Sequence, residues 1–238
     1  MEPEVCAVCI TADRPDLTRK AVACFEGQTY RAKRLVIYDT SKAAGEIVRY
    51  HGHFQRVVIG GSQQTMGEMR NTANAFADPG EVIVQWDSDD FSDPNRIAEQ
   101  VALLQSSGAD CVGFNEMLFW REPSPELPCG EAWLYNNPNP TYALGTSLCY
   151  WRESWSRKPF AATNVGEDLQ FCTGLKVLGL SSLTEMGSIA GCDPRMIARI
   201  HPGNTSTAYA PEKMRANSEW RRVPEWDDFC RSTMCATT

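Results

Sequence analysis

Apolar and polar residues alternate in blocks along the first half of the chain. Short apolar runs predict β-strands at residues 5–11, 34–38, 56–59, 82–86 and 109–115. Helical periodicity predicts helices at residues 17–26, 66–77 and 94–105, and Asp16 is placed to cap the first of them. Strands and helices that alternate at this spacing predict an α/β fold, with a mostly parallel central sheet and helices on both faces.

The second half of the chain is less regular. Residues 122–140 are rich in proline and asparagine and predict a long loop with one short strand at most. The patterns predict strands at 147–151 and 196–200, and helices at 169–178 and 211–220, whereas residues 225–238 carry no strong pattern. We expect a single domain with a first half of about residues 1–116, a mixed second half of about 117–210, and a C-terminal helix and tail at 211–238.

Composition and charge narrow the class of protein. The formal net charge of -7 opposes binding to nucleic acid and to anionic membranes. The N-terminus is not a signal peptide, and no apolar run approaches the thickness of a bilayer. The ten cysteines are scattered through mostly apolar stretches, which is typical of reduced, buried thiols. Cys6 and Cys9 lie in one predicted strand and face opposite sides, so packing is favoured over metal binding. We expect a soluble, cytoplasmic protein.

An acidic cluster follows the predicted strand at 82–86. Asp87, Asp89 and Asp90 surround Ser88, and such carboxylates repel one another unless a cation or water compensates them. Ligands of α/β proteins bind at the carboxyl ends of the strands. Asp87 and Asp89 would offer hard oxygen ligands, which suit Mg²⁺ or Mn²⁺. The alternative is a solvated loop that caps the next helix.

A series of short motifs resembles the family 2 glycosyltransferases, which have the GT-A fold. The motifs are Gln28-Thr29 before a strand that ends at Asp39, Gly67 with Arg70-Asn71, the strand that leads into Asp87-Ser88-Asp89, Gly145 to Arg152, Gly166-Glu167-Asp168, and His201. They follow the order of the family over about residues 5–206, and order and spacing together are more specific than any one motif. The chain departs from the family at Asp13, where an asparagine is usual, and after Asp39, where a second acid and Gly-Ser are usual.

The resemblance implies a nucleotide-diphosphate sugar donor, with a UDP-sugar favoured, bound across the first half of the chain. The residues implied to bind it are Thr11, Asp13, Asp39, Arg70, Asp87 and Ser88. A divalent metal, Mn²⁺ or Mg²⁺, would be held by Asp89 and His201, with Asp87 as a further ligand. Taken by itself, Arg70 is equally open to pairing with Glu68 or with the acidic cluster.

The second half would bind the acceptor and carry the general base. Asp168 is implied as the base of an inverting transfer, with Glu167 as the second choice, although acids also favour the start of any helix. Trp151 and Arg152 are expected on the acceptor side. The acceptor would be a saccharide or a small molecule.

Three other hypotheses stay open from the sequence. One is a nucleotidyltransferase that forms sugar nucleotides, and another is a non-catalytic module that binds them. The third is a glycosyltransferase whose acceptor is a hydroxylated base in phage DNA. Two basic groups would serve the DNA acceptor, unless they are solvated faces: Arg14, Arg19, Lys20, Arg31, Lys33 and Arg34, and then Arg215, Arg221 and Arg222.

Overall fold

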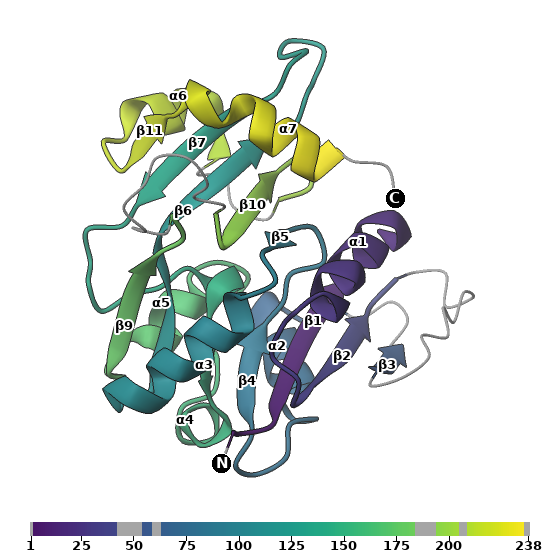
Figure 1. The fold of residues 1–238 in the computed structure, drawn as a ribbon, viewed down its shortest axis with the longest axis vertical. Coiled ribbons are helices and arrows are strands. Elements are labelled where there is room, and N and C mark those ends of the chain that lie inside the picture. The colour runs from purple at the N-terminus through teal and green to yellow at the C-terminus, as the bar shows by residue number, and fades with distance from the viewer. Residues whose placement is uncertain (1, 42–53, 59–62, 184–193, 205–208, 236–238) are drawn as a thin grey trace.

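The computed structural model describes residues 2–41, 54–58, 63–183, 194–204 and 209–235 (Figure 1). The strands are β1 (Val5–Thr11), β2 (Lys33–Asp39), β3 (Phe54–Val58), β4 (Val82–Gln85), β5 (Phe91–Ser92), β6 (Cys111–Arg121), β7 (Glu131–Asn136), β8 (Cys149–Trp151), β9 (Val177–Ser181), β10 (Met196–Ile200) and β11 (Trp220–Arg222). The helices are α1 (Pro15–Glu26), α2 (Met66–Asn74), α3 (Arg96–Ser107), α4 (Arg152–Arg157), α5 (Glu167–Cys172), α6 (Pro211–Ala216) and α7 (Asp227–Cys235).

The described strands form one sheet, whose main path runs β11-β7-β6-β8-β4-β1-β2-β3. β4, β1, β2 and β3 are parallel, whereas β8 lies antiparallel between β4 and β6. The predicted α/β fold with a mostly parallel central sheet is therefore confirmed. The predicted strand at 56–59 corresponds to β3, and its last residue lies outside the described part of the chain.

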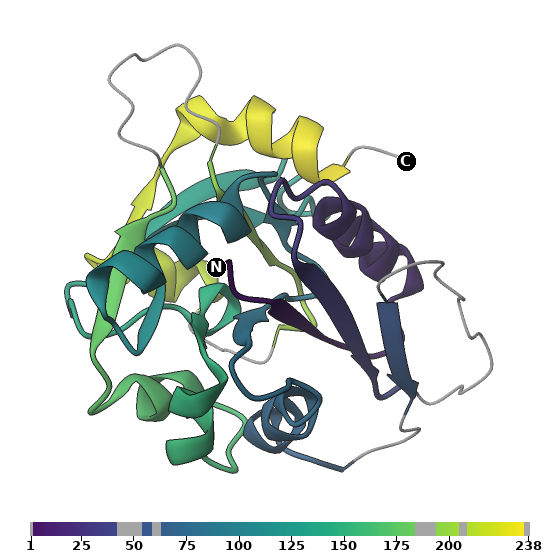
Figure 2. The ribbon, with the colours of Figure 1, turned by 60° about the horizontal axis from the view of Figure 1, so that its bottom comes forward.

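Helices cover both faces of the central sheet (Figure 2). Val5, Ala7 and Cys9 of β1 pack in one cluster with α1 and α3. Cys6 and Val8 point the other way and pack in a second cluster with α2 and α5. This alternation follows from the two-residue period of a strand, and it confirms that Cys6 and Cys9 face opposite sides. Burial raises the pKa of the Cys6 thiol to about 12, as suits a packing residue.

The second half extends the sheet with β6, β7, β10 and β11. α6 packs on one face of this extension, where Phe119, Met214 and Trp220 share an apolar cluster. α7 covers the other face, where Cys230 and Met234 share a cluster with residues of β6 and β7. No helix in the described ranges is both long enough and apolar enough to span a bilayer.

Three predictions for the second half need correction. The helix predicted at 169–178 ends at Cys172, and its C-terminal part forms β9, which pairs with β6. Gly174 has a φ of +82° and turns the chain between the two elements. The helix predicted at 211–220 ends at Ala216 and is followed by β11. The unpatterned tail contains α7, whereas the one short strand allowed in the loop at 122–140 is present as β7.

The start of α1 also differs from the prediction. The helix begins at Pro15, so Arg14 occupies the capping position and makes no side-chain capping hydrogen bond. Asp16 lies in the first turn and forms an ion pair with Arg19 at 2.6 Å. Pro15 explains the shift, because its fixed φ suits the first position of a helix.

Candidate active site

The parallel strands β1, β2 and β4 end at one edge of the sheet. Thr11 at the end of β1 lies opposite Asp39 at the end of β2, and the N–H of Thr40 donates to the carbonyl of Thr11 at 2.9 Å. β4 leads directly into the acidic cluster. The polar residues that the sequence places after separate strands are therefore gathered at the same edge.

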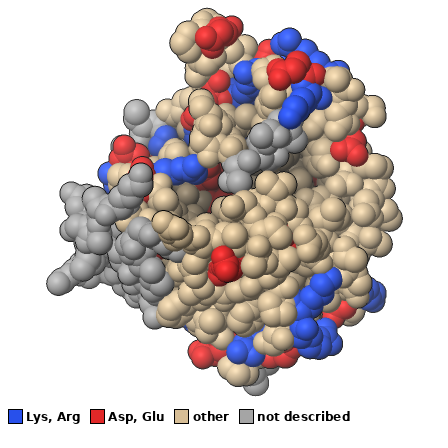
Figure 3. All heavy atoms as spheres, turned by 180° about the vertical axis from the view of Figure 1, so that it is seen from behind, with Lys and Arg blue, Asp and Glu red and all other residues tan. Residues whose placement is uncertain are grey.

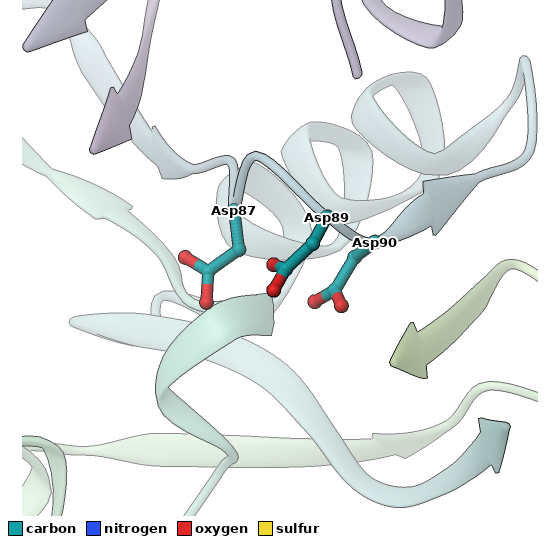
Figure 4. A group of neighbouring side chains, drawn as sticks. All are labelled: Asp87, Asp89 and Asp90. Atoms are coloured by element: carbon teal, nitrogen blue, oxygen red, sulfur yellow. The ribbon is translucent and has the colours of Figure 1, made fainter. Parts of the chain in front are cut away.

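The acidic cluster consists of Asp87, Asp89 and Asp90, with the buried Ser88 between them. The three side chains point to the same side of the loop (Figure 4). One carboxylate oxygen from each lies within 4.8 Å of the other two. The loop is followed by β5, which pairs with β10 and so fixes its far end.

Asp89 has two cationic or potentially cationic partners on one oxygen atom. Arg14 Nη1 donates to Asp89 Oδ2 at 2.8 Å, and His201 Nε2 lies 2.9 Å from the same oxygen. Arg14 also reaches the carbonyl of Gly203 at 3.3 Å. The structure thus brings together Asp89 and His201, the two residues that the family resemblance implies as metal ligands.

The other two carboxylates have partners of their own. Asp90 accepts from Thr146 Oγ1 at 2.5 Å and from the N–H of Arg199 at 3.0 Å. Asp87 lies 4.0 Å from Arg70 Nη1. Burial raises the pKa of Asp87 against the opposing effect of Arg70. Burial and the neighbouring carboxylates raise the pKa of Asp90 well above its usual range.

This donor set fits a divalent metal. The oxygens of Asp87, Asp89 and Asp90 are hard ligands that lie close together. Burial and the neighbouring carboxylates raise the pKa values of Asp87 and Asp90, and a bound cation would offset the cost of keeping these two groups charged. The guanidinium of Arg14 already lies against Asp89 as a cation of the chain itself.

Arg199 of β10 ties the acidic loop to the C-terminal helix. Its Nε donates to the backbone carbonyl of Asp89 at 3.0 Å, and its Nη2 donates to the carbonyl of Met234 at 2.9 Å. Its Nη1 contacts Glu122. A buried guanidinium with this many partners fixes the loop firmly.

Arg70 of α2 lies at the centre of a buried polar network. It donates to Gln85 Oε1 at 2.5 Å and to Glu167 Oε1 at 3.4 Å. Gln85 Nε2 in turn donates to Asn74 Oδ1 at 3.1 Å and to the Tyr150 hydroxyl at 2.6 Å. Burial raises the pKa of Glu167, and Arg70 opposes that rise. Arg70 therefore connects the end of β4 to the start of α5.

The N-terminus of α2 sets the position of Arg70. Thr65 and Glu68 form a reciprocal capping box, so Glu68 is engaged in the cap and not in a pair with Arg70. A Cβ on Gly67 would lie 1.8 Å from the carbonyl oxygen of Ala161, so only glycine permits this approach.

Asp168 is clamped at the start of α5. The Tyr142 hydroxyl donates to Asp168 Oδ2 at 2.7 Å, and the N–H of Gly145 donates to the same oxygen at 3.1 Å. A Cβ on Gly145 would lie 2.9 Å from that oxygen, so the clamp requires glycine. Burial raises the pKa of Tyr142, and Asp168 raises it further, so the phenol stays protonated and donates.

Two adjoining cavities open on these residues. The smaller, of about 160 Å³, is lined by the acidic cluster and by Arg14 and Arg199. The larger, of about 480 Å³, is lined by Glu167, Asp168 and several aromatic rings. Asp87 and Thr146 belong to the lining of both cavities. The acidic cluster and Asp168 thus line neighbouring cavities that share part of their lining.

The predicted residues at the ends of β1 and β2 lie at the same edge but outside the linings of these two cavities. The Thr11 hydroxyl bonds the Thr18 hydroxyl at 2.8 Å. Asp39 Oδ1 accepts from the N–H of Ser41 at 2.9 Å, and the N–H of Asp13 donates to Ser41 Oγ at 2.7 Å. These bonds order the two loops, with Asp13 at a φ of +53°.

The structure does not bring Trp151 and Arg152 to the site. Trp151 pairs with Val82 at the beginning of β4, and the N–H of Arg152 donates to the carbonyl of Glu81 at 3.0 Å. Both residues therefore lie at the amino end of the parallel strands, opposite the cavities. Because β8 runs antiparallel to β4, its last residue lies at the wrong edge for this expectation.

Three residues of the site were not predicted in their observed places. Arg14 was assigned to a basic surface group, although it follows the first strand at the same sheet edge as the acidic cluster. Tyr142 lies in a proline- and asparagine-rich loop with no local signal. Arg199 lies in a strand that reads as apolar, and a lone arginine in such a strand signals a buried partner.

Known structures share this fold. No family model and no curated protein matches the sequence. Residues 1–349 of S. aureus TarS superpose with a TM-score of 0.60 at 13% identity, covering 82% of this chain and 60% of that one. The mannosyltransferase PcManGT from Pyrobaculum calidifontis, solved with GDP-Man and Mn²⁺, gives a TM-score of 0.56 at 15% identity, covering 79% and 59%.

GalNAc-T7, solved with UDP, GalNAc and Mn²⁺, gives a TM-score of 0.59 at 13% identity, covering 90% of this chain and 47% of that one. The S. aureus protein has also been solved with UDP and with UDP-GlcNAc. The chain spans less than two thirds of the length of each of these proteins. The superpositions on these proteins show that the chain has a GT-A-like glycosyltransferase fold.

Proposed function

We propose that the chain transfers a sugar from a nucleotide-diphosphate sugar to an acceptor hydroxyl, with inversion and with the help of a divalent metal. One observation carries the proposal: the acidic cluster and Asp168 line adjoining cavities that share Asp87 and Thr146. A leaving diphosphate and an attacking hydroxyl need separate but neighbouring binding positions, which two such cavities can supply. The shared fold with glycosyltransferases supports this interpretation.

The donor would lie across the carboxyl ends of β1, β2 and β4. The residues proposed to bind it are Thr11, Asp13, Asp39, Arg70, Asp87 and Ser88. The buried bonds of Arg70 to Gln85 and Glu167 favour a role in which it holds Asp87 in place. We favour a UDP-sugar, since UDP or UDP-GlcNAc is bound in two of the similar proteins, although a third binds GDP-Man.

Asp89 and His201 would hold the metal, with Asp87 as a further ligand. Mn²⁺ is present in two of the similar structures, and Mg²⁺ suits the same oxygens. When bound, the metal would neutralise charge that develops on the departing diphosphate.

Asp168 is the proposed general base. It would accept the proton of the acceptor hydroxyl while that oxygen attacks the anomeric carbon, and a single displacement inverts the configuration. Glu167 is the weaker candidate, because it is buried and bonded to Arg70. The clamp on Asp168 supplies the fixed orientation that such a transfer needs.

The acceptor would bind in the larger cavity. Asp87, Glu167, Asp168 and Glu219 contribute carboxylates to its lining, and Arg70 is the basic residue among its described lining groups. This charge balance favours an uncharged saccharide or small molecule over a phosphate-bearing nucleic acid.

The basic groups in the sequence do not favour nucleic acid either. Arg14, Arg34 and Arg222 are engaged in ion pairs with acids of the chain. On the face opposite to that of Figure 1, basic side chains lie in small groups among acidic ones (Figure 3).

The nucleotidyltransferase and binding-module alternatives are not favoured by the structural comparisons. The nine described cysteines are free thiols, which supports a reducing, cytoplasmic location.

A thermal-shift panel of nucleoside diphosphates and sugar nucleotides tests the proposal. Each ligand is measured with Mn²⁺, with Mg²⁺ and with chelator. We expect the nucleotides of one nucleobase to raise the melting temperature of the protein, and only when metal is present. A ligand that binds the native state stabilises that state by mass action. The Asp89→Ala variant should lose this shift. A well-folded protein that shifts with no nucleotide contradicts the proposal.

A further inference from the structure

Arg14 is held more loosely than Arg70 and Arg199, the two other arginines described beside the acidic cluster. It lies in the loop between β1 and α1 and contacts Asp89 and, at 3.3 Å, the carbonyl of Gly203. Its side chain is 32% exposed, whereas those of Arg70 and Arg199 are 6% and 5% exposed. Arg70 and Arg199 are locked in buried networks, so Arg14 is the guanidinium that can leave at little cost.

The position of Arg14 conflicts with a metal on the same carboxylate. Its Nη1 lies 2.8 Å from Asp89 Oδ2, and His201 Nε2 lies 2.9 Å from that oxygen. A metal ligated by the same oxygen would bind at about 2.1 Å. Two donors and a metal would crowd one oxygen, and the metal and the guanidinium would repel each other as like charges.

Arg14 also lies where a diphosphate would meet it. It lines the smaller cavity together with Asp87, Asp89 and Asp90. A guanidinium presents a planar fork of donors that suits phosphate oxygens. A rotation of this partly exposed side chain within the cavity would exchange a carboxylate partner for a phosphate partner.

We propose that Arg14 exchanges between Asp89 and the diphosphate of the donor. Without a donor it occupies Asp89 and weakens metal binding. With a donor it contacts the diphosphate and leaves Asp89 to the metal. This exchange would couple metal binding to donor binding, and it rests on the function proposed above.

Mn²⁺ binding to the intact chain tests the exchange without any turnover. Free Mn²⁺ is measured by electron paramagnetic resonance, with and without UDP or GDP, in the wild type and in Arg14→Met. Without nucleotide, we expect Arg14→Met to bind Mn²⁺ roughly fivefold more tightly or better, the lower end of common coupling factors. The gain in Mn²⁺ affinity on adding nucleotide should be smaller in Arg14→Met than in the wild type.

Two further variants keep the test specific. Arg14→Lys retains the charge but not the fork, and its Mn²⁺ affinity without nucleotide should lie between those of the wild type and Arg14→Met. Arg19→Met is the matched control, because Arg19 is exposed and pairs with Asp16 on the same helix. Its Mn²⁺ affinity should equal that of the wild type, and thermal melting should show all variants folded.

The outcomes separate the two proposals. If nucleotide and Mn²⁺ bind together but Arg14→Met binds Mn²⁺ no more tightly than the wild type, the exchange is wrong and the proposed function stands. If no variant binds Mn²⁺ or either nucleotide, the proposed function is wrong and the exchange is overturned with it.

Discussion

Asp89 and Asp168, the carboxylates proposed to hold the metal and to act as the base, have different kinds of partner. In the smaller cavity, Asp89 lies against the guanidinium of Arg14. In the larger cavity, the described donors to Asp168 Oδ2 are neutral, namely the Tyr142 hydroxyl and the N–H of Gly145. A cationic partner neutralises a carboxylate, whereas a neutral donor orients it and leaves its charge. The first arrangement suits the holding of charged groups, and the second suits the acceptance of a proton.

Glu219 repeats the second arrangement in the same cavity. It accepts from the Tyr135 hydroxyl at 3.0 Å and from Asn217 Nδ2 at 3.4 Å. Such a carboxylate can still accept hydrogen bonds from the hydroxyls of an acceptor. Glu219 therefore resembles Asp168 in its neutral described donors, whereas Glu167 in the same cavity pairs with Arg70.

The largest expected effect comes from removing the proposed base. Asp168→Asn should lower turnover by roughly 10²- to 10⁴-fold, the usual contribution of general acid–base catalysis. The metal-dependent thermal shift with nucleotide should persist, because Asp168 lies outside the lining of the smaller cavity. Glu167→Gln is the matched control, and a larger loss of turnover in that variant would reverse the assignment of the base.

Removing the buried cation of Arg70 should cost stability. Arg70→Met leaves Glu167 and Asp87 without their buried cation, and we expect the free energy of unfolding to fall by about 3 kcal/mol. Urea denaturation measures the change. Arg157→Met breaks the exposed pair with Asp110 and should cost less than about 1 kcal/mol. An equal fall in the free energy of unfolding of the two variants would contradict the expectation that the buried ion pair contributes more than the exposed one.

A smaller effect should follow from loosening the clamp on Asp168. Tyr142→Phe removes one hydrogen bond to a charged group and should lower kcat by about tenfold. The KM for the donor should not change. Tyr135→Phe, the matched variant beside Glu219, should instead raise the KM for the acceptor. A change in donor KM in Tyr142→Phe would contradict its role as a positioning residue.

The smallest effect is expected at the opposite edge of the sheet. Trp151→Phe should leave the KM for the acceptor within about twofold of the wild type, as for substitutions away from a site. Steady-state kinetics with varied acceptor checks this. A large rise in the KM for the acceptor would indicate that Trp151 contacts the acceptor after all.

The central sheet could be predicted because local sequence determines it. Apolar runs followed by polar turns mark β1, β2 and β4, and parallel order then brings the acidic cluster to one edge with Thr11 and Asp39. Where tertiary pairing decides, the pattern fails. Residues 177–181 pair with β6, although the helical pattern runs on to residue 178, and Gly174 was the local signal of the change.

Residues of the candidate site could be predicted only where a short sequence motif contains them. Asp89 and Asp168 follow from short motifs, but their partners come from distant parts of the chain. Arg14 lies 75 residues from Asp89 in sequence, and Tyr142 lies 26 residues from Asp168. Strand direction is equally non-local, and it decides that Trp151 lies at the far edge.

The order in which the chain is synthesised determines when the bonds of Arg199 can form. The acidic cluster is made early, but its partners Arg199 and His201 follow about a hundred residues later, at separations of 110 and 112 from Asp89. The carbonyl of Met234 that holds Arg199 comes later still. Of the partners of Asp89, Arg14 is synthesised before the loop, whereas Arg199 and His201 can bind the loop only after β1 to β9 have been synthesised.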